Sequence, residues 1–169
     1  LLEYIKLGTD DRIYAIAQLL RLNCTVERIC DETKIDRFFI DKLLNIVSEE
    51  ENLKNAVGNK SALYKAKKMG FSDKAIAYLW NMNETDIFNF RKSAGIFPVY
   101  KMIDTCACEF ESYVPYFYST YEDENESVVS NKKKIIVLGS GPIRIGQGVE
   151  FDYSTVHAVK TIKEAGFEA

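Results

Sequence analysis

The stretch KKKIIVLGSGPIRIGQGVEFDYSTVHA, residues 132–158, is the most informative part of this 169-residue chain. It opens with a short apolar run rich in β-branched residues (133–138), continues as a glycine-punctuated loop (139–148) and ends with helical periodicity. A strand, a glycine loop and a helix in this order form the opening unit of a doubly wound α/β domain. Because the chain reaches Ala169 where a second strand should begin, we expect the incomplete start of such a domain, within a piece of a longer polypeptide.

The first hundred residues predict a compact helical domain. Apolar side chains recur at three- and four-residue spacing, as in Ile13, Ile16 and Leu20, and the turns between the runs carry capping residues and glycines. The longest predicted helix starts near Ile35 and continues to Leu53 or beyond. The expected caps and helix ends are Thr9 or Asp10, Thr25, a break at Gly58 and Asn59, Gly70, Ser72, Asn83 with Asp86, and Gly95.

The helical pattern stops at Pro98. Residues 99–103 predict an extended segment, aromatic side chains crowd 113–121, and the acidic stretch EDENESVVSN (122–131) lacks helical periodicity. We interpret the aromatic cluster as packing at a domain boundary and the acidic stretch as a linker. The expected fold class is mainly α: a helical domain (1–121), a linker (122–131) and an incomplete, Rossmann-like β-loop-α unit (132–169).

Charge and composition exclude several kinds of partner. The formal net charge is −3 and the isoelectric point is near 5.3, whereas a nucleic-acid surface normally shows a basic patch. No apolar run approaches the ~20 residues of a membrane span. We therefore expect neither nucleic acid nor a membrane as a partner.

The four cysteines and the single histidine do not form a metal site in the sequence. Cys106 and Cys108 are too close for an ordinary disulfide or a zinc knuckle, and Cys24 and Cys30 form no C-x-x-C pair. We expect reduced, mostly buried thiols in a cytoplasmic protein. His157 has no triad partner nearby in sequence, so we interpret it as a packed or surface imidazole.

The glycine loop departs from the common nucleotide motifs. Gly139 and Gly141 supply the first two glycines of G-x-G-x-x-G, but Arg144 stands at the third and no G-K-[ST] follows. Such a loop faces the ligand crevice of an open α/β sheet. In one interpretation the glycines of the loop only relieve steric strain in a tight connection from strand to helix. In the second interpretation Arg144 forms an ion pair with a bound anion. In this second interpretation Gln147 donates a hydrogen bond to the anion, and Gly146 and Gly148 leave room beside it.

Longer segments resemble a known family. VLGSGPIRIGQGVEFDYSTVHA (137–158) resembles the first strand and loop of the C-terminal synthetase half in the large subunit of carbamoyl-phosphate synthases. Upstream, IDRFFIDKL, GFSDKAIAYL and PVYKMIDTCACEFESYVPYFYSTYEDE resemble the helical oligomerization domain that joins the two halves. The resemblance runs from about Asp11 to the last residue, with Cys108 where a small residue is common. It implies that the second unit begins a pre-ATP-grasp domain.

The resemblance also implies a function. The family makes carbamoyl phosphate from bicarbonate, ammonia (usually released from glutamine) and two ATP, in two ATP-grasp halves with Mg²⁺. The ATP and Mg²⁺ sites lie in regions that this chain does not contain, so we expect no cofactor and no catalytic residue here. The implied partners are the remaining synthetase halves, a glutaminase subunit or domain, and further copies of the chain. Arg144 and Gly148 match channel-lining positions on the path of carbamate. The alternative function is a nucleotide- or anion-binding α/β domain centred on the loop 139–148.

Overall fold

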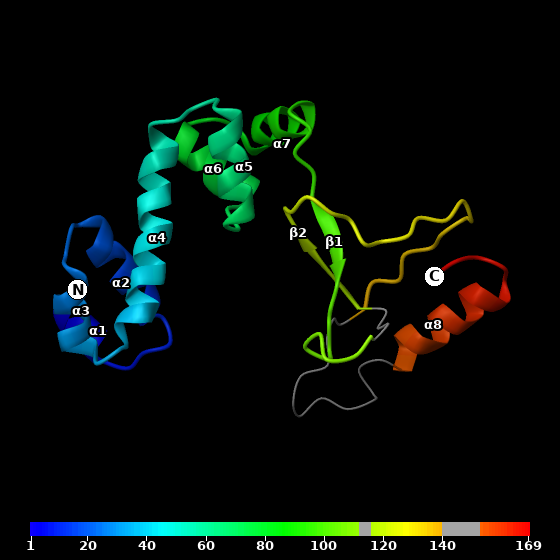
Figure 1. Cartoon of the computed structure of the whole chain (residues 1–169), viewed down its shortest axis with the longest axis horizontal. Coiled ribbons are helices and arrows are strands. Elements are labelled where there is room, and N and C mark those ends of the chain that lie inside the picture. Colours follow the sequence, from blue (N-terminus) through cyan, green and yellow to red (C-terminus); the bar gives the residue numbers. More distant parts are fainter. Residues whose placement is uncertain (112–115, 140–152) are drawn as a thin grey trace. The chain divides into compact units, whose positions relative to one another are not determined.

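The computed structural model describes residues 1–111, 116–139 and 153–169, which divide into two units, Leu1–Ser127 and Val128–Ala169. The helices of the first unit and its two strands are labelled in Figure 1. The domain bounds expected from the sequence stay predictions. The elements of the first unit are α1 (Leu2–Lys6), α2 (Arg12–Arg21), α3 (Val26–Thr33), α4 (Arg37–Lys54), α5 (Lys60–Lys68), α6 (Asp73–Trp80), α7 (Glu84–Ser93), β1 (Val99–Met102) and β2 (Phe117–Thr120).

The long helix α4 joins two hydrophobic clusters within the first unit. One end of α4 packs with α2 and α3, and the other with α5 and α6 (Figure 1). The first cluster is built around Ile5, Ile16, Ile29 and Ile40, and the second around Leu53, Leu63, Ile76, Ile87 and Trp80. The apolar spacing of the sequence therefore predicts α2 to α7, but it does not reveal that their apolar faces form two clusters.

Most predicted caps are confirmed. The side chains of Thr25 and Ser72 accept hydrogen bonds from backbone N–H groups in the first turn of α3 and α6. Asn59, predicted only as a break, also caps a helix, since its side chain accepts from the first turn of α5. Gly70 and Gly95 have φ values of +91° and +74°, in the left-handed region that glycine adopts at little cost after a helix.

The cap predicted at Thr9 or Asp10 is wrong, and the cap predicted at Asn83 is confirmed in its position before α7 but not in a bond to the backbone. The helix α2 begins after Asp11, not after Thr9 or Asp10, and the carboxylate of Asp11 accepts from the Tyr4 hydroxyl at 2.5 Å instead of capping the helix. Asn83 precedes α7, but its side chain donates to Asp86 and accepts no backbone N–H. The side chains of Asp11 and Asn83 therefore each form a hydrogen bond with another side chain and not with the helix backbone.

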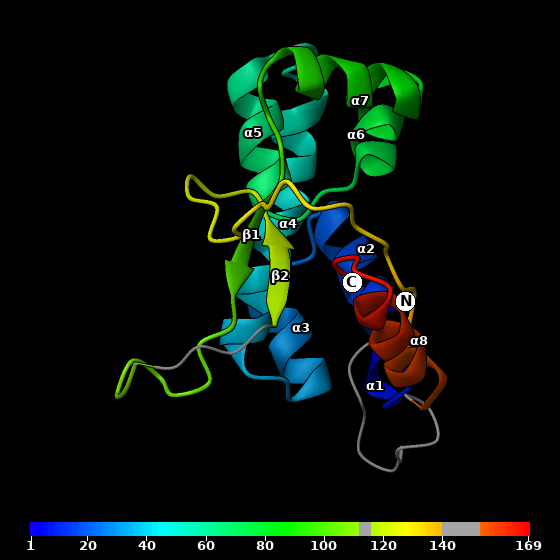
Figure 2. The same cartoon turned by 90° about the vertical axis from the view of Figure 1, so that its right-hand side faces the viewer.

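The extended segment predicted after Pro98 is confirmed as β1. It pairs antiparallel with β2, with Val99 opposite Thr120 and Met102 opposite Phe117. Figure 2 shows the two strands side by side. The acidic stretch predicted as a linker follows β2, and its residues 122–127 belong to the first unit.

In the second unit the predicted helix is confirmed as α8, which spans Tyr153–Glu164. The predicted strand over 133–138 is present only as one parallel bridge, between Lys134 and Glu168, and most of the predicted loop lies outside the described residues. Among the described residues of this unit none is buried, and Ile136 and Leu138 are 86% and 92% exposed. The apolar run thus has no core to pack against among the described residues of its unit.

Candidate functional site

A single parallel bridge joins the segment before the glycine loop to the segment after α8. The Ile135 N–H donates to the Glu168 carbonyl over 2.8 Å, and the Glu168 N–H donates to the Lys133 carbonyl over 3.0 Å. The segment before the glycine loop and the segment after α8 therefore meet in parallel at one bridge, as the two strands of a β-α-β unit do.

The first glycine of the loop lies against α8. A Cβ atom added to Gly139 would come within 3.3 Å of the Thr155 Cγ2 atom, which is tighter than ordinary van der Waals contact. Gly139 therefore permits the close approach of strand and helix that the fingerprint glycines provide.

The other predicted loop residues lie outside the described part of the chain: Gly141, Arg144, Gly146, Gln147 and Gly148. Their roles beside an anion or along a channel stay predictions. His157 is exposed on α8, with its ring centroid 4.3 Å from that of Tyr153, which agrees with a surface imidazole.

A buried ionic cluster in the first unit was not predicted from the sequence. The Asp73 carboxylate accepts from Lys67 Nζ over 2.8 Å and from Arg91 Nε over 2.7 Å. Burial alone would raise the pKa of Asp73, but the hydrogen bonds from Lys67 and Arg91 outweigh it, so the pKa lies below its ordinary value. Lys67 and Arg91 also lie over the ring of Tyr121. The cluster ties α5, α6 and α7 to the end of β2.

The sequence carries only a local signal for this cluster. Asp73 follows the cap Ser72, and an acid at this position is already explained by its favourable interaction with the helix dipole. Arg91 lies eighteen residues further along the chain, so no local pattern links it to Asp73. Every member finds a partner inside the cluster. It is therefore a structural clamp rather than a reactive group.

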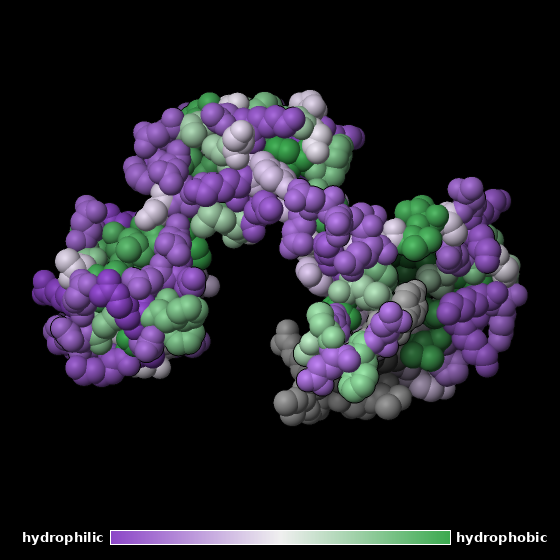
Figure 3. Space-filling model, in the orientation of Figure 1, coloured by the Kyte–Doolittle hydropathy of each residue, from purple (hydrophilic) through white to green (hydrophobic). Residues whose placement is uncertain are grey.

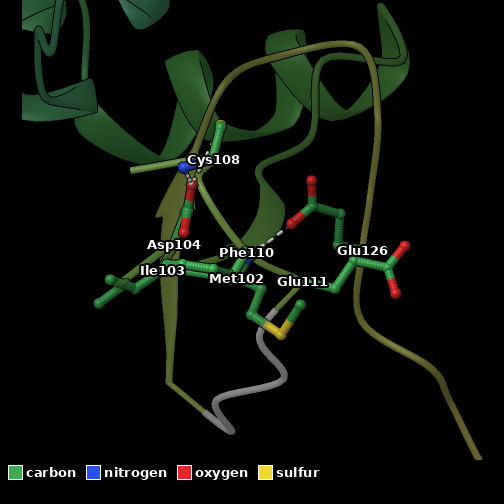
Figure 4. Close-up of a pocket in the computed structure, with 7 residues that line it drawn as sticks. All are labelled: Met102, Ile103, Asp104, Cys108, Phe110, Glu111 and Glu126. Atoms are coloured by element: carbon green, nitrogen blue, oxygen red, sulfur yellow. Dashed lines mark hydrogen bonds between the residues drawn. The ribbon is translucent and has the colours of Figure 1, made fainter. Parts of the chain in front are cut away.

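A shallow hollow of about 360 Å³ lies beyond the end of β1 (Figure 4). Its lining combines apolar side chains with the carboxylates of Asp104, Glu111 and Glu126. The Asp104 carboxylate accepts from the backbone N–H groups of Cys106 and Cys108 over 2.9 and 2.7 Å. These bonds hold a turn in which Ala107 and Cys108 have positive φ values of 50° and 61°.

The cysteine prediction is partly wrong. Cys24, Cys30 and Cys106 are half-buried, Cys108 is exposed, and all four are free thiols. The hydrogen bond to Asp104 and the charge of that carboxylate raise the pKa of the Cys108 thiol. An exposed thiol with a raised pKa is a poor nucleophile at neutral pH. Among the described residues no three His, Cys, Asp or Glu side chains gather as a metal site.

The described residues also contain no helix of sufficient length and hydrophobicity to traverse a bilayer. The described residues thus form a helical unit held together by two apolar clusters and a buried clamp, and a second unit that contains the helix α8.

Two family models match this chain. The carbamoyl-phosphate synthetase large chain oligomerisation domain matches residues 1–95, which include α1 to α7. The carbamoyl phosphate synthase preATP-grasp domain matches residues 131–169, which include α8 and the sequence of the glycine loop. The chain therefore belongs to the large-chain family of carbamoyl-phosphate synthetase, and the resemblance seen in the sequence is confirmed.

Proposed function

We propose that the helical unit connects the two synthetase halves of a carbamoyl-phosphate synthase and associates with further copies of itself. The observation that carries this proposal is the match of the oligomerisation domain to residues 1–95, over all seven helices of the first unit. Both hydrophobic clusters lie almost wholly within this match. In this proposal the described chain supplies structure, and the ligase chemistry belongs to ATP-grasp regions with bound ATP and Mg²⁺.

The buried polar groups support a structural role. Among the described residues the Thr9 hydroxyl alone is a buried side-chain polar atom without a hydrogen-bond partner. A catalytic centre usually keeps unpaired or strongly perturbed groups in a cleft, and the helical unit offers none among those residues.

The surface of the helical unit supports association. Phe38 and Phe39 on α4 are 59% and 60% exposed, and Tyr78 on α6 is 86% exposed. Figure 3 shows apolar side chains on the visible surface. Exposed aromatic side chains are typical of surfaces that bind another protein.

Absence of catalysis is directly testable. The purified chain should hydrolyse no ATP above the blank, with or without bicarbonate and Mg²⁺. Measurable, protein-dependent ATP hydrolysis would contradict the proposal. The same preparation should give no heat with ATP or NAD in calorimetry; a saturable signal would favour the alternative, a nucleotide- or anion-binding domain centred on residues 139–148.

For the loop we propose a role on the path of carbamate. Gly148 would leave the passage open and Arg144 would place a cation beside an anionic intermediate. In the full-length enzyme, Gly148→Leu should preserve bicarbonate-dependent ATP hydrolysis while carbamoyl phosphate output falls. Gly148→Ala is the matched control and should lower output less. Unchanged output in Gly148→Leu would show that Gly148 does not line the path.

We further propose the partners that the family implies: the remaining synthetase halves and a glutaminase subunit or domain, in the cytoplasm. The free state of the four cysteines agrees with a reducing compartment.

A further inference from the structure

Among the described residues no third strand pairs with the outer edge of β1 in the two-stranded sheet. In an antiparallel pair, alternate N–H groups of a strand point toward and away from its partner. The Ile103 N–H donates to the Tyr116 carbonyl on the β2 side over 2.9 Å. By this alternation the N–H groups of Tyr100 and Met102 point to the outer edge of β1.

Side chains of the segment 122–127 meet these outward groups. The Tyr100 N–H donates to Asn125 Oδ1 over 2.9 Å. The Met102 N–H donates to Glu126 Oε2 over 2.6 Å, a contact between two residues drawn in Figure 4. One backbone bond accompanies them, from the Glu126 N–H to the Tyr100 carbonyl over 2.8 Å. The segment thus covers the edge mainly with side-chain acceptors where a strand would use carbonyl groups.

Lys101 adds a charged contact to the same segment. Its Nζ lies 3.5 Å from carboxylate oxygens of both Glu124 and Glu126 and 3.9 Å from one of Glu122. The Lys101 side chain is 15% exposed, while that of Glu124 is 83% exposed. Exposed ion pairs of this kind are weak and are screened by salt.

The Asn125 amide is held in the orientation that β1 requires. Its Nδ2 group donates to the Ser127 hydroxyl over 2.9 Å, which leaves Oδ1 toward Tyr100. Two side chains, one backbone hydrogen bond and Lys101 therefore hold the segment to β1, and the Tyr64 hydroxyl donates to Asp123 Oδ1 over 2.9 Å. None of these contacts belongs to the ladder between β1 and β2, so all of them, the Tyr64 bond included, can open without disrupting that ladder.

We propose that residues 122–127 form a releasable clasp on the outer edge of β1, which sets the length of the tether to the second unit. With the clasp closed, the free tether is 128–131; with it open, the tether is 122–131. At ~3.3–3.6 Å per extended residue, its reach rises from about 14 Å to about 35 Å. The clasp rests on the contacts of β1 and is independent of the proposed function.

Amide hydrogen exchange of the full chain tests the clasp. In Glu126→Ala the Met102 amide should exchange about tenfold faster, and in Asn125→Ala the Tyr100 amide should do so, as expected for the loss of one hydrogen bond. The Ile103 amide reports on the ladder and should stay within about threefold of its wild-type rate. Glu124→Ala is the matched control, because its carboxylate contacts Lys101 and no backbone amide among the described residues.

Two results would overturn the clasp. Equal acceleration of Ile103 would show that the segment and the sheet open as one body, and unchanged rates at Tyr100 and Met102 would show that the side chains do not hold the edge. Trp80 fluorescence should match the wild type in every variant, which checks that the helical unit is folded.

Tether length gives a second readout. Small-angle scattering of the variant Asn125→Ala/Glu126→Ala should show a larger maximum dimension than the wild type at low salt. Raising the salt concentration should bring the wild type toward the variant, because screening weakens the Lys101 contacts. Identical scattering of the two proteins at low salt would contradict a tether controlled by the clasp.

Discussion

The two units of this chain differ in how they bury apolar side chains. The first unit buries sixteen apolar residues in two clusters around α4, whereas the described residues of the second bury none. Yet the second has the more recognisable sequence, with its apolar strand and glycine loop. The comparison shows that a motif specifies local order, while stability requires a second layer that covers the apolar face.

The largest expected difference between the units is in amide hydrogen exchange. Amides of α6, next to Ile76 and Trp80, should exchange only through global unfolding, whereas amides of α8 should open locally. Because a stable domain unfolds at a cost of ~5–15 kcal/mol, we expect protection in α6 to exceed that in α8 by about a thousandfold or more. Similar protection in both helices, measured by NMR, would mean that the second unit has a core of its own.

Core truncation sharpens the same comparison. Ile87 on α7 is fully buried, and Ile87→Ala should destabilise the first unit by about 2–5 kcal/mol. Urea unfolding followed by Trp80 fluorescence measures this, since Trp80 is the one tryptophan and lies in the same cluster. The controls are Phe88→Ala, next along α7 and 43% exposed, and Val156→Ala on α8, 60% exposed. A loss in either control as large as that of Ile87→Ala would contradict the assignment of the core.

The buried clamp adds a pH dependence to the first unit. Asp73→Asn should cost about 1.5–3 kcal/mol at pH 7, as expected for hydrogen bonds to a charged group. Because the folded pKa of Asp73 lies below its unfolded value of about 3.9, its contribution is full above about pH 5 and is lost as the pH falls further.

The difference between Asp73→Asn and the wild type should therefore shrink between about pH 5 and pH 2. Glu51→Gln, which removes an exposed pair with Lys54, is the control and should leave the urea midpoint unchanged. A constant difference across this pH range would show that Asp73 acts through shape and not through charge.

Helix caps should give the smallest effects. Asn59→Ala removes the acceptor for the N–H groups of Ser61 and Ala62 and should cost about 0.5–2 kcal/mol. Asn83→Ala should cost less, because the Asn83 side chain caps no backbone group. Equal losses in the two variants, measured by urea unfolding, would show that the observed side-chain bonds do not determine cap strength.

Much of the helical architecture follows from local patterns. The spacing of Ile13, Ile16 and Leu20 predicts α2, and the caps Thr25 and Ser72 correctly predict where α3 and α6 begin. The helix α1 was not predicted, because its five residues are too short for a period to show. Its stability comes instead from Ile5, which is fully buried in the first cluster.

Long-range contacts explain what the sequence did not reveal. Asp73 and Arg91 meet only because α6 and α7 pack together, and the acidic stretch after β2 has no pattern that signals its attachment to β1. For the candidate site, the helix α8 was predictable from periodicity, whereas the strand predicted before Gly139 is present only as one bridge at Lys134. The roles of Arg144 and Gly148 stay predictions, since they depend on residues outside the described part.

Sedimentation velocity of the purified chain over a wide concentration range tests the central claim most directly. If the helical unit carries assembly, the weight-average sedimentation coefficient should rise reversibly with concentration toward that of a dimer or tetramer. The variant Phe38→Glu/Phe39→Glu places charge on the exposed aromatic pair of α4. A shift of the rise to higher concentration would show that this face of α4 lies in the interface between copies, and an unchanged rise would show that it does not. A strict monomer at every concentration would contradict self-association and leave the helical unit as a brace within its own polypeptide.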